Sequence, residues 1–356
     1  MKIIIIGCGK VGYALAEELT EEKQEVTIID SSSERLQEVE EELDALQILG
    51  NGSSLSVLME ADIKNTDLLI SVTGSDELNL LCCLIAKKVG KCQTVARVRN
   101  PVYNKELSFI KESLGISMII NPEMAAALEI ARLLRFPSAD LPQKVKCDIL
   151  VSGIERGEQV HIPNGDFVLQ NGDFVSIIAS PQNAAKFFKN IGLKTDQVKN
   201  CMIVGGGTIA IYLARLLLES KIRVEIIEKS QERCQKLAEL LPGAMIVQGD
   251  GTNKRLLMEE NLENAEAFVT LTNMDEENVL LTLFAKENSN AKLVTKVNRI
   301  SFDHILDQLD LGSVIYPKYI TTDYILRYTR AAQNSIGSNV ETLYHILDNK
   351  AEALEF

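Results

Sequence analysis

The sequence predicts an α/β protein with two doubly wound parallel sheets in tandem and a small α+β lobe between them. The first observation behind this is an internal repeat. Gly7 and Gly205 lie 198 residues apart (205 − 7), as do Asp30 and Glu228 (228 − 30). The second is that each copy alternates β-branched apolar runs with stretches of helical period, the pattern of a parallel sheet with crossover helices. One domain has therefore been duplicated.

The period of the apolar residues indicates the elements of each copy. Strand Ile3–Ile6 is an unbroken apolar run, as expected for a strand that is covered on both faces of a sheet. A glycine turn, a helix and a second strand follow in each copy, which makes a βαβ unit, so each lobe is Rossmann-like. The expected strands are Ile3–Ile6, Glu25–Ile29, Ala45–Leu49, Leu68–Val72, Thr94–Val98, Met202–Val204 and Arg223–Ile227, and the expected helices are Val11–Thr20, Ser32–Leu43, Leu78–Val89 and Ile209–Glu219.

The segment between the copies has a different texture. From Leu141 to Leu193, short apolar runs are separated by turn dipeptides such as Asn171-Gly172, which favour hairpins. We therefore expect four parts: a first nucleotide-binding lobe at 1–136, a small α+β lobe at 137–195, a second nucleotide-binding lobe at 198–333 and a tail at 334–356. The apolar helix Pro122–Phe136, which ends at Pro137, is expected to link two of these parts and to offer a surface to a partner.

Composition argues against several classes of function. The 356 residues carry 37 basic and 50 acidic side chains, a formal net charge of -13, without a block of Lys or Arg, so nucleic acid is not an expected partner. The N-terminal apolar run is too short for a signal peptide or a membrane span. Seven cysteines without CxxC spacing indicate reduced thiols in a cytoplasm, not disulfides or a metal site. Three dispersed histidines make a histidine-centred active site unexpected.

The first glycine turn has the pattern of a dinucleotide site. It lies between a buried strand and a helix, and Asp30 closes the next strand 18 residues beyond Gly12 (30 − 12). The glycines permit a tight turn and close approach of backbone amides to a pyrophosphate, while the aspartate accepts ribose hydroxyls and repels a 2′-phosphate. A structural relic of such a site is the alternative. The candidate residues are Gly7, Cys8, Gly9, Lys10, Val11, Gly12 and Asp30.

The second glycine turn departs slightly from the first. Ala210 stands at the third glycine position, and Glu228 replaces the aspartate. Alanine is small enough for close packing of helix on strand, and glutamate still reaches a ribose. We therefore expect a second nucleotide site, with a different affinity. Its candidate residues are Gly205, Gly206, Gly207, Thr208, Ile209 and Glu228.

Three further repeated strings end strands on the same sheet edge. Asn51 and Asp250, each between two glycines, either border an adenine ring or belong to an ordinary turn before a helix cap. Thr73 and Thr272 follow the fourth strand, where ligands of doubly wound sheets bind. Asp76 and Asp275 are expected to cap the next helices. At the fifth strand one basic residue of each copy either contacts a phosphate oxygen or is a solvated charge; the candidates are Arg97 and Arg99, and Lys296 and Arg299.

The strings MKIIIIGCGKVGYALAEELTEEKQEVTIID, SVTGSDELNLLCCLIAKKVG, ARVRNP and NPEMAAALEIARLLRFP resemble the TrkA-type regulatory subunit of the Trk potassium transporter. Such subunits contain RCK domains, which regulate potassium conductance. The resemblance implies homo-oligomeric rings, from dimer to tetramer, in the cytoplasm at the inner face of the membrane. There NAD(H), ATP and ADP change the ring shape and so gate a multi-span potassium-transporter subunit. It also adds Gly74, Val98, Asn273 and Val297 to the cofactor-binding residues.

The resemblance leaves two alternatives and one departure. An NAD-dependent oxidoreductase would need a proton-transfer residue near the nicotinamide, and His161 lies in a turn-rich stretch without an obvious carboxylate partner. We therefore expect no catalytic residue and no enzyme. A nucleotide sensor for a partner unrelated to potassium is the other alternative. The family usually has a second small lobe, so the short tail is expected to be the start of a truncated one, unless this member of the family is itself short.

Overall fold

The computed structural model describes residues 1–100, 106–135, 149–156, 159–165, 167–170, 173–179, 198–298, 311–334, 342–346 and 351–355, with the single residues 103, 183, 186, 187, 306 and 309. The chain divides into two compact units, residues 1–134 with 198–326 and residues 135–197 with 327–356. Both Rossmann-like lobes belong to the first unit, although the sequence suggests two separate domains. The predicted helix end at Pro137 and the candidate Arg299 lie outside the described residues.

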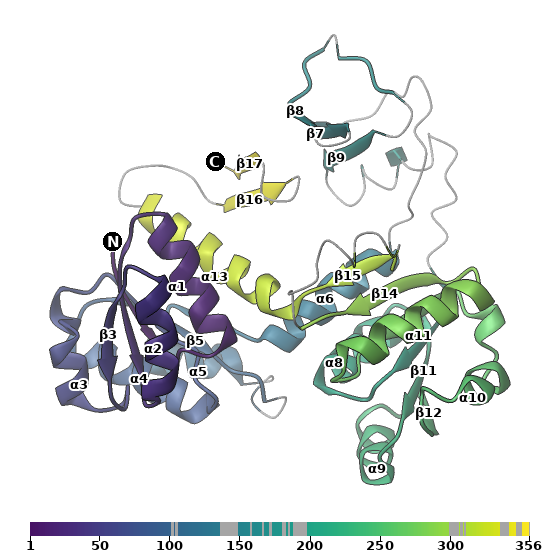
Figure 1. Cartoon of the computed structure of the whole chain (residues 1–356), viewed down its shortest axis with the longest axis horizontal. Coiled ribbons are helices and arrows are strands. Elements are labelled where there is room, and N and C mark those ends of the chain that lie inside the picture. The colour runs from purple at the N-terminus through teal and green to yellow at the C-terminus, as the bar shows by residue number, and fades with distance from the viewer. Residues whose placement is uncertain are drawn as a thin grey trace. The chain divides into compact units, whose positions relative to one another are not determined.

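The first lobe, drawn in purple to blue in Figure 1, is built on a six-stranded parallel sheet with the order β3-β2-β1-β4-β5-β6. Its strands are β1 (Lys2–Ile6), β2 (Glu25–Asp30), β3 (Leu46–Leu49), β4 (Leu68–Ser71), β5 (Gln93–Arg97) and β6 (Met118–Ile120). Its helices are α1 (Lys10–Glu21), α2 (Ser33–Glu42), α3 (Leu55–Glu60), α4 (Asp76–Val89) and α5 (Leu107–Leu114). The short edge strand β6 was not expected from the sequence.

The second lobe repeats this arrangement with the order β12-β11-β10-β13-β14-β15. Its strands are β10 (Asn200–Val204), β11 (Arg223–Glu228), β12 (Met245–Gln248), β13 (Ala267–Thr270), β14 (Lys292–Lys296) and β15 (Ser313–Ile315). Its helices are α8 (Thr208–Glu219), α9 (Gln231–Leu240), α10 (Lys254–Glu259), α11 (Asp275–Asn288) and α13 (Pro317–Asn334). The predicted α/β class with two tandem doubly wound sheets is confirmed.

The strand order creates a crevice between β1 and β4. Ile6, at the end of β1, pairs with Ile29 of β2 on one side and with Ser71 of β4 on the other. Because the connections from these strands diverge to opposite sides, a doubly wound sheet binds ligands at this point. Gly7 continues the chain with a φ of +98°, and a Cβ there would lie 3.0 Å from the backbone nitrogen of Thr73. Only glycine allows both the positive φ and this close approach.

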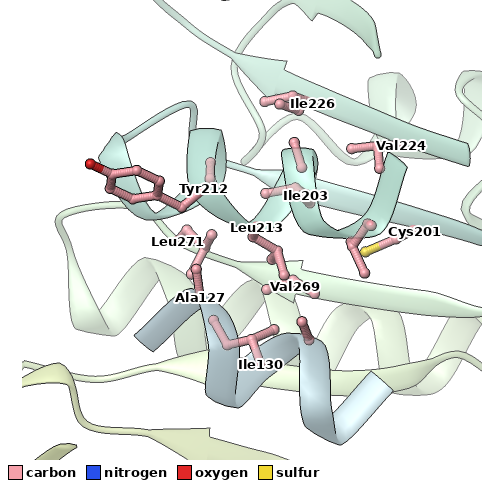
Figure 2. Close-up of a cluster of buried hydrophobic side chains, with 14 of the residues drawn as sticks. Ala127, Ile130, Cys201, Ile203, Tyr212, Leu213, Val224, Ile226, Val269 and Leu271 are labelled. Carbon is pink, nitrogen blue, oxygen red and sulfur yellow. The ribbon is translucent and has the colours of Figure 1, made fainter. Parts of the chain in front are cut away.

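Helix α6 (Pro122–Arg135) follows the first sheet but packs against the second. Figure 2 shows Ala127 and Ile130 of α6 pointing toward Val269 and Leu271 of the second lobe. The apolar surface of this helix, which the sequence analysis assigned to a partner, is therefore covered within the chain. An apolar face in the sequence does not say which surface covers it, and that is why the prediction was wrong. Leu128, on another face of α6, stays 45% exposed.

A polar contact also joins the two lobes. Tyr212 of α8 is only 1% exposed, and its hydroxyl lies at the edge of the apolar cluster (Figure 2). Asn121 Nδ2 donates to that hydroxyl at 3.0 Å, and the hydroxyl donates to the backbone oxygen of Arg99 at 3.4 Å. The helix that follows the second glycine turn is thus bonded to the loop that follows β5 of the first lobe.

The second unit contains small antiparallel sheets. β7 (Leu150–Arg156), β8 (Gln159–His161) and β9 (Phe174–Ile178) form a sheet with the order β8-β7-β9, in the segment where the sequence predicts the small lobe. β16 (Thr342–Ile346) and β17 (Ala351–Glu355) pair as a hairpin in the predicted tail. Within the described ranges, no helix is long and apolar enough to cross a membrane.

Candidate nucleotide-binding sites

A cavity of 570 Å³ opens at the carboxyl edge of the first sheet, at the crevice between β1 and β4. This volume is in the usual range of small-molecule sites, about 300–1,000 Å³. The structure brings together most of the residues predicted for this site: Gly7, Gly9, Lys10, Val11, Asp30, Asn51, Thr73 and Gly74 line the cavity. Four others do not line it: Cys8, Gly12 and Val98 are buried, and Arg99 is partly exposed and pairs with Asp76.

Helix α1 begins at this cavity with its first backbone amides uncapped. Its N-cap residue is Gly9, and no side chain of the described residues bonds to this helix end. By contrast, the serine hydroxyls of Ser32 and Ser75 cap α2 and α4. Helix α8 of the second lobe begins like α1, with Gly207 as an N-cap residue that carries no capping side chain. Free amides and the helix dipole attract phosphate oxygens, so both helix ends fit the predicted pyrophosphate.

The third glycine position distinguishes the two turns. A Cβ on Gly12 would lie 1.9 Å from the carbonyl oxygen of Gly7, so the first turn requires glycine there. In the second turn Ala210 fills this place and is fully buried. The second turn therefore leaves room for a methyl group that the first turn excludes.

Asp30 is buried at the end of β2, with 6% of its surface exposed. The backbone nitrogen of Cys8 donates to its Oδ2 at 2.6 Å, and that of Ser32 donates to its Oδ1 at 2.8 Å. Arg35, which lines the cavity from α2, lies 3.6 Å from the same carboxylate. Each carboxylate oxygen keeps a second lone pair, so Asp30 holds the glycine turn in place and still fits a ribose hydroxyl.

The second cavity, of 440 Å³, occupies the equivalent position in the second lobe. Its lining includes the predicted residues Gly205, Gly206, Gly207, Thr208, Glu228, Asp250, Thr272 and Asn273, but not Ile209 or Val297. Glu228 accepts hydrogen bonds from the backbone nitrogens of Gly206 and Ser230, both at 2.8 Å. Arg233 Nε donates to the carbonyl oxygen of Gly206 at 2.8 Å. The larger acid thus holds the second glycine turn as Asp30 holds the first.

An ion pair without a counterpart in the first lobe lies beside the second cavity. Lys229 Nζ is 2.6 Å from Asp250 Oδ2. The lysine bond and a hydrogen bond from the Thr252 hydroxyl lower the pKa of Asp250 to about 2. The same residue bonds the amide of Thr252 at 3.0 Å, and Asn51 repeats this turn bond with Ser53 in the first lobe. Both residues therefore shape a turn and also line a cavity. The two alternatives, a turn residue and a residue at a ligand cavity, are thus compatible with each other.

One buried amide that the sequence analysis did not include among the site residues organises the far wall of each cavity. Asn79 is fully buried, and its Oδ1 accepts from the backbone nitrogen and the hydroxyl of Thr73 at 2.8 and 2.7 Å. Its Nδ2 donates to the carbonyl oxygen of Arg97 at 2.8 Å. Asn278 makes the same bonds to Thr272 and to the Lys296 carbonyl oxygen. Each asparagine therefore ties the turn after the fourth strand to the end of the fifth.

The expected helix caps at Asp76 and Asp275 were wrong. Ser75 is the capping residue of α4, and Asp76 is the first residue inside the helix. Its Oδ2 accepts from the backbone nitrogens of Arg99 and Asn100 at 2.9 and 2.8 Å. Asp275 likewise accepts from the backbone nitrogen of Asn298 at 3.0 Å. The spacing of residues in the sequence does not tell whether a residue is the N-cap or the first residue of the helix. In both lobes the aspartate binds the loop after the fifth strand instead.

The basic residues at the end of the fifth strand differ in position. Arg97 lines the first cavity and donates to the carbonyl oxygen of Thr73. Arg99 does not line the cavity; it donates to the carbonyl oxygen of Gly74 at 2.7 Å and pairs with Asp76. Lys296 is buried beside the Leu271 carbonyl oxygen. Burial lowers the pKa of both Arg97 and Lys296. Of these residues, Arg97 is the one placed to meet a phosphate oxygen.

The side chains and backbone groups that line the two cavities indicate the ligand that would fit them. Within the described part of the chain, no cluster of His, Cys, Asp or Glu side chains is arranged to hold a metal ion. His161 lies in the small sheet, with its ring 5.5 Å from that of Phe167. The cavities instead offer backbone amides for phosphates, a carboxylate for a ribose, and an apolar floor from strand ends such as Ile6 and Ile29. These residues fit an adenine nucleotide.

Comparisons with known sequences agree with this two-lobed arrangement. The TrkA-N domain family matches residues 3–122 and 201–317, and the TrkA-C domain family matches residues 138–192. The Trk system potassium uptake protein trkA homolog 1 of Methanosarcina mazei is 31% identical over 394 aligned positions, covering 100% of this chain and 94% of that protein. The Trk system potassium uptake protein TrkA of Halomonas elongata is also 31% identical over 388 positions, with coverage of 100% and 83%.

Solved structures share the fold at low sequence identity. The GsuK channel bound to NAD has a TM-score of 0.73 and 15% identity, and the match covers 96% of this chain and 66% of that one. The structure of GsuK bound to ADP has a TM-score of 0.64 and 15% identity, with coverage of 94% and 69%. At this identity the likeness concerns the fold.

Proposed function

Because the chain belongs to the TrkA family of Trk-system potassium uptake proteins, we propose that it is a nucleotide-responsive regulatory subunit of a potassium transporter. Its ligands are adenine nucleotides, NAD(H) and ATP or ADP. Its partner is a multi-span membrane subunit, at whose cytoplasmic face it acts as a homo-oligomeric ring. It transmits ligand binding as a change of shape and catalyses no reaction.

The observation that carries this proposal is the repeated pair of uncapped helix ends. Gly9 and Gly207 each precede a helix whose first amides lie at a cavity, and Asp30 and Glu228 line the same cavities, where we expect them to bind a ribose. A chain that retains two such sites after duplication fits a sensor that reads two ligands or one ligand twice. The names of two solved relatives of the fold, bound to NAD and to ADP, support the class of ligand.

A regulatory role also requires that binding favours one shape over another. A ligand shifts an equilibrium only by its difference in affinity for the two states. The contact of Tyr212 with Asn121 and Arg99 supports such a response, because it links the helix at the second glycine turn to the loop after β5 of the first lobe. A ligand that moves either cavity wall would strain this contact.

Calorimetric titration with NAD, NADH, ADP and ATP tests the proposal. Asp30→Ala is expected to remove binding at the first cavity and Glu228→Ala at the second, since each loses its ribose acceptor and the anchor of its glycine turn. Glu263→Ala, which removes an exposed carboxylate outside both cavities, is the control. If no adenine nucleotide produces heat with the wild-type chain, the proposal is wrong.

A second experiment addresses the transporter. The chain is expected to co-purify with a multi-span potassium transporter and to change its potassium flux when nucleotide is added, with the double variant Asp30→Ala/Glu228→Ala as the unresponsive control. Oxidation of NADH by any small substrate in the presence of the chain would instead favour the oxidoreductase alternative. Nucleotide binding without any effect on potassium flux would favour a sensor for another partner.

A further inference from the structure

The two cavities share an architecture but differ in charge. The first is lined by three cations and one carboxylate, a formal charge of +2 (3 − 1), from Lys10, Arg35, Arg97 and Asp30. The second is lined by two cations and three carboxylates, a formal charge of -1 (2 − 3), from Lys229, Arg233, Glu228, Asp250 and Glu277. Two sites that arose by duplication therefore differ by three unit charges.

Exchanges at three equivalent positions amount to this difference, because the contributions of Arg97 and Lys229, which lack a charged counterpart in the other cavity, cancel. Lys10, the first residue of α1, corresponds to Thr208 (10 + 198), which begins α8. Leu78 of α4 corresponds to Glu277 of α11 (78 + 199), and both line their cavities. Asn51 corresponds to Asp250 (51 + 199). Each of these exchanges makes the second cavity more negative by one charge.

The contacts show which charges remain available to a ligand. In the second cavity Lys229 is paired with Asp250 at 2.6 Å, and Glu277 also raises the pKa of this lysine. The second cavity therefore keeps carboxylates in excess. In the first cavity Asp30 is paired with Arg35, whereas Lys10 makes no ion pair with any described residue. The first cavity keeps cations in excess.

The position of Leu78 and Glu277 decides which part of a ligand lies next to the difference in charge between the two cavities. They lie on the helix after the fourth strand, across the crevice from the carboxylate that closes the second strand. With the ribose at that carboxylate and the first phosphates at the glycine turn, the remainder of a nucleotide extends toward Leu78 or Glu277. In ATP and ADP this remainder is a terminal phosphate, whereas in NAD it is a nicotinamide nucleoside and both phosphates are internal diesters.

We infer that the two cavities select different nucleotides: the first takes nucleotides that end in a free phosphate, and the second takes dinucleotides and rejects a terminal phosphate. This inference rests on the proposed function. In the first cavity the ammonium of Lys10 and the guanidinium of Arg97 attract a terminal phosphate. In the second cavity the Glu277 carboxylate repels it, but accepts hydrogen bonds from ribose hydroxyls and attracts the cationic ring of oxidised nicotinamide.

Reciprocal exchange of the two side chains tests this inference. Each cavity is measured alone, with Gly205→Val disabling the second and Gly7→Val disabling the first, because a side chain at either positive-φ glycine meets the backbone just after the fourth strand of its sheet. Titrations with ATP and NAD contain EDTA, so that divalent cations do not bridge phosphates to carboxylates. Leu78→Glu is expected to weaken ATP binding at the first cavity about tenfold, and Glu277→Leu to strengthen it at the second about tenfold, with smaller changes for NAD.

Matched controls exist on the same two helices. Leu81 and Leu280 are exposed by 46% and 67% and occupy equivalent positions (81 + 199) outside the cavities. Leu81→Glu and Leu280→Glu add the same charge there and are expected to leave the ratio of ATP to NAD affinity unchanged. If Leu78→Glu fails to fold, as judged by circular dichroism, the surface pair Lys10→Thr and Thr208→Lys tests the same difference, with the same direction of change expected.

The outcomes separate the inference from the function on which it rests. If no adenine nucleotide binds to either cavity, the proposed function fails. If both cavities bind nucleotides with the same ratio of ATP to NAD affinity, and the exchanges leave that ratio unchanged, the charge-based selection is wrong while the nucleotide-binding function stands. A tenfold or larger difference in the ratio that reverses on exchange supports the inference.

Discussion

Replacement of Asn79 by alanine should destabilise the first lobe more than any exposed substitution on the same helix. The side chain is fully buried, and its amide bonds to the Thr73 backbone nitrogen at 2.8 Å and to the Arg97 carbonyl oxygen at 2.8 Å. Truncation removes the partner of these two partly buried backbone groups. Since each buried unsatisfied group costs about 1–3 kcal/mol, the expected loss in free energy of unfolding is about 2–6 kcal/mol.

Urea denaturation followed by circular dichroism measures this loss. Leu81→Ala, at a position on α4 that is 46% exposed, is the control and is expected to cost no more than about 1 kcal/mol. Asn278→Ala should destabilise the second lobe by a similar amount, because Asn278 bonds the Thr272 nitrogen at 3.0 Å and the Lys296 carbonyl oxygen at 2.9 Å. Should Asn79→Ala unfold at the same urea concentration as Leu81→Ala, the amide does not hold these strand ends and the reasoning fails.

Three further changes have expected outcomes. Gly12→Ala should weaken nucleotide binding at the first cavity by tenfold or more, measured by calorimetry, because the new Cβ meets the Gly7 carbonyl oxygen at 1.9 Å. Ala210→Gly should change the nucleotide affinity of the second cavity by no more than about threefold. Tyr212→Phe should lower the free energy of unfolding by about 1 kcal/mol in a urea titration, because the hydroxyl bonds between the lobes are lost. Burial, and to a smaller extent the nearby Glu260, raise the pKa of Glu225 to about 7. The free energy of unfolding should therefore fall as the pH rises from about 4.5 to 7. Glu225→Gln should stabilise the protein by about 1–2 kcal/mol at pH 8, after allowance for solvent screening.

Each of these has a result that would contradict it. Unchanged nucleotide affinity in Gly12→Ala would mean that the first turn accommodates a methyl group at this position as the second turn does. A Tyr212→Phe protein as stable as the wild type would mean that water replaces the lost bonds. For Glu225, the sign follows from a folded state that binds the proton more tightly than the unfolded chain, and a wild-type stability that rises between pH 5 and 7 while Glu225→Gln stays flat would refute it.

The parts of the fold that depend on local pattern were predictable from the sequence. Four isoleucines followed by Gly7 specify a buried strand and a tight turn, and Asp30 closes the next strand at the spacing of a ribose acceptor. These features repeat 198 residues later (205 − 7 for Gly205), so each copy supports the interpretation of the other. Both glycine turns accordingly lie at cavities.

Features that depend on three-dimensional contact were not predictable. Arg35 lies on the helix after Asp30, and nothing in its spacing indicates that it lines the first cavity. Asn79 lies within a predicted helix, and the sequence does not indicate that its side chain bonds to the ends of two strands. The apolar face of Pro122–Arg135 had to be covered, but its periodicity is the same whether the covering surface is another protein or the second lobe. The predicted division into four parts stays a prediction.

Helix α6 has a consequence for how the two copies can be separated. It belongs by sequence to the first copy, and residues such as Ala127 and Ile130 complete the apolar core of the second. During synthesis this helix leaves the ribosome before the lobe that it will cover. A cloned fragment that starts after the helix would expose the apolar surface on which the helix packs, and would aggregate. A single copy of the repeat would expose the same surface unless the equivalent helix of a second molecule covered it.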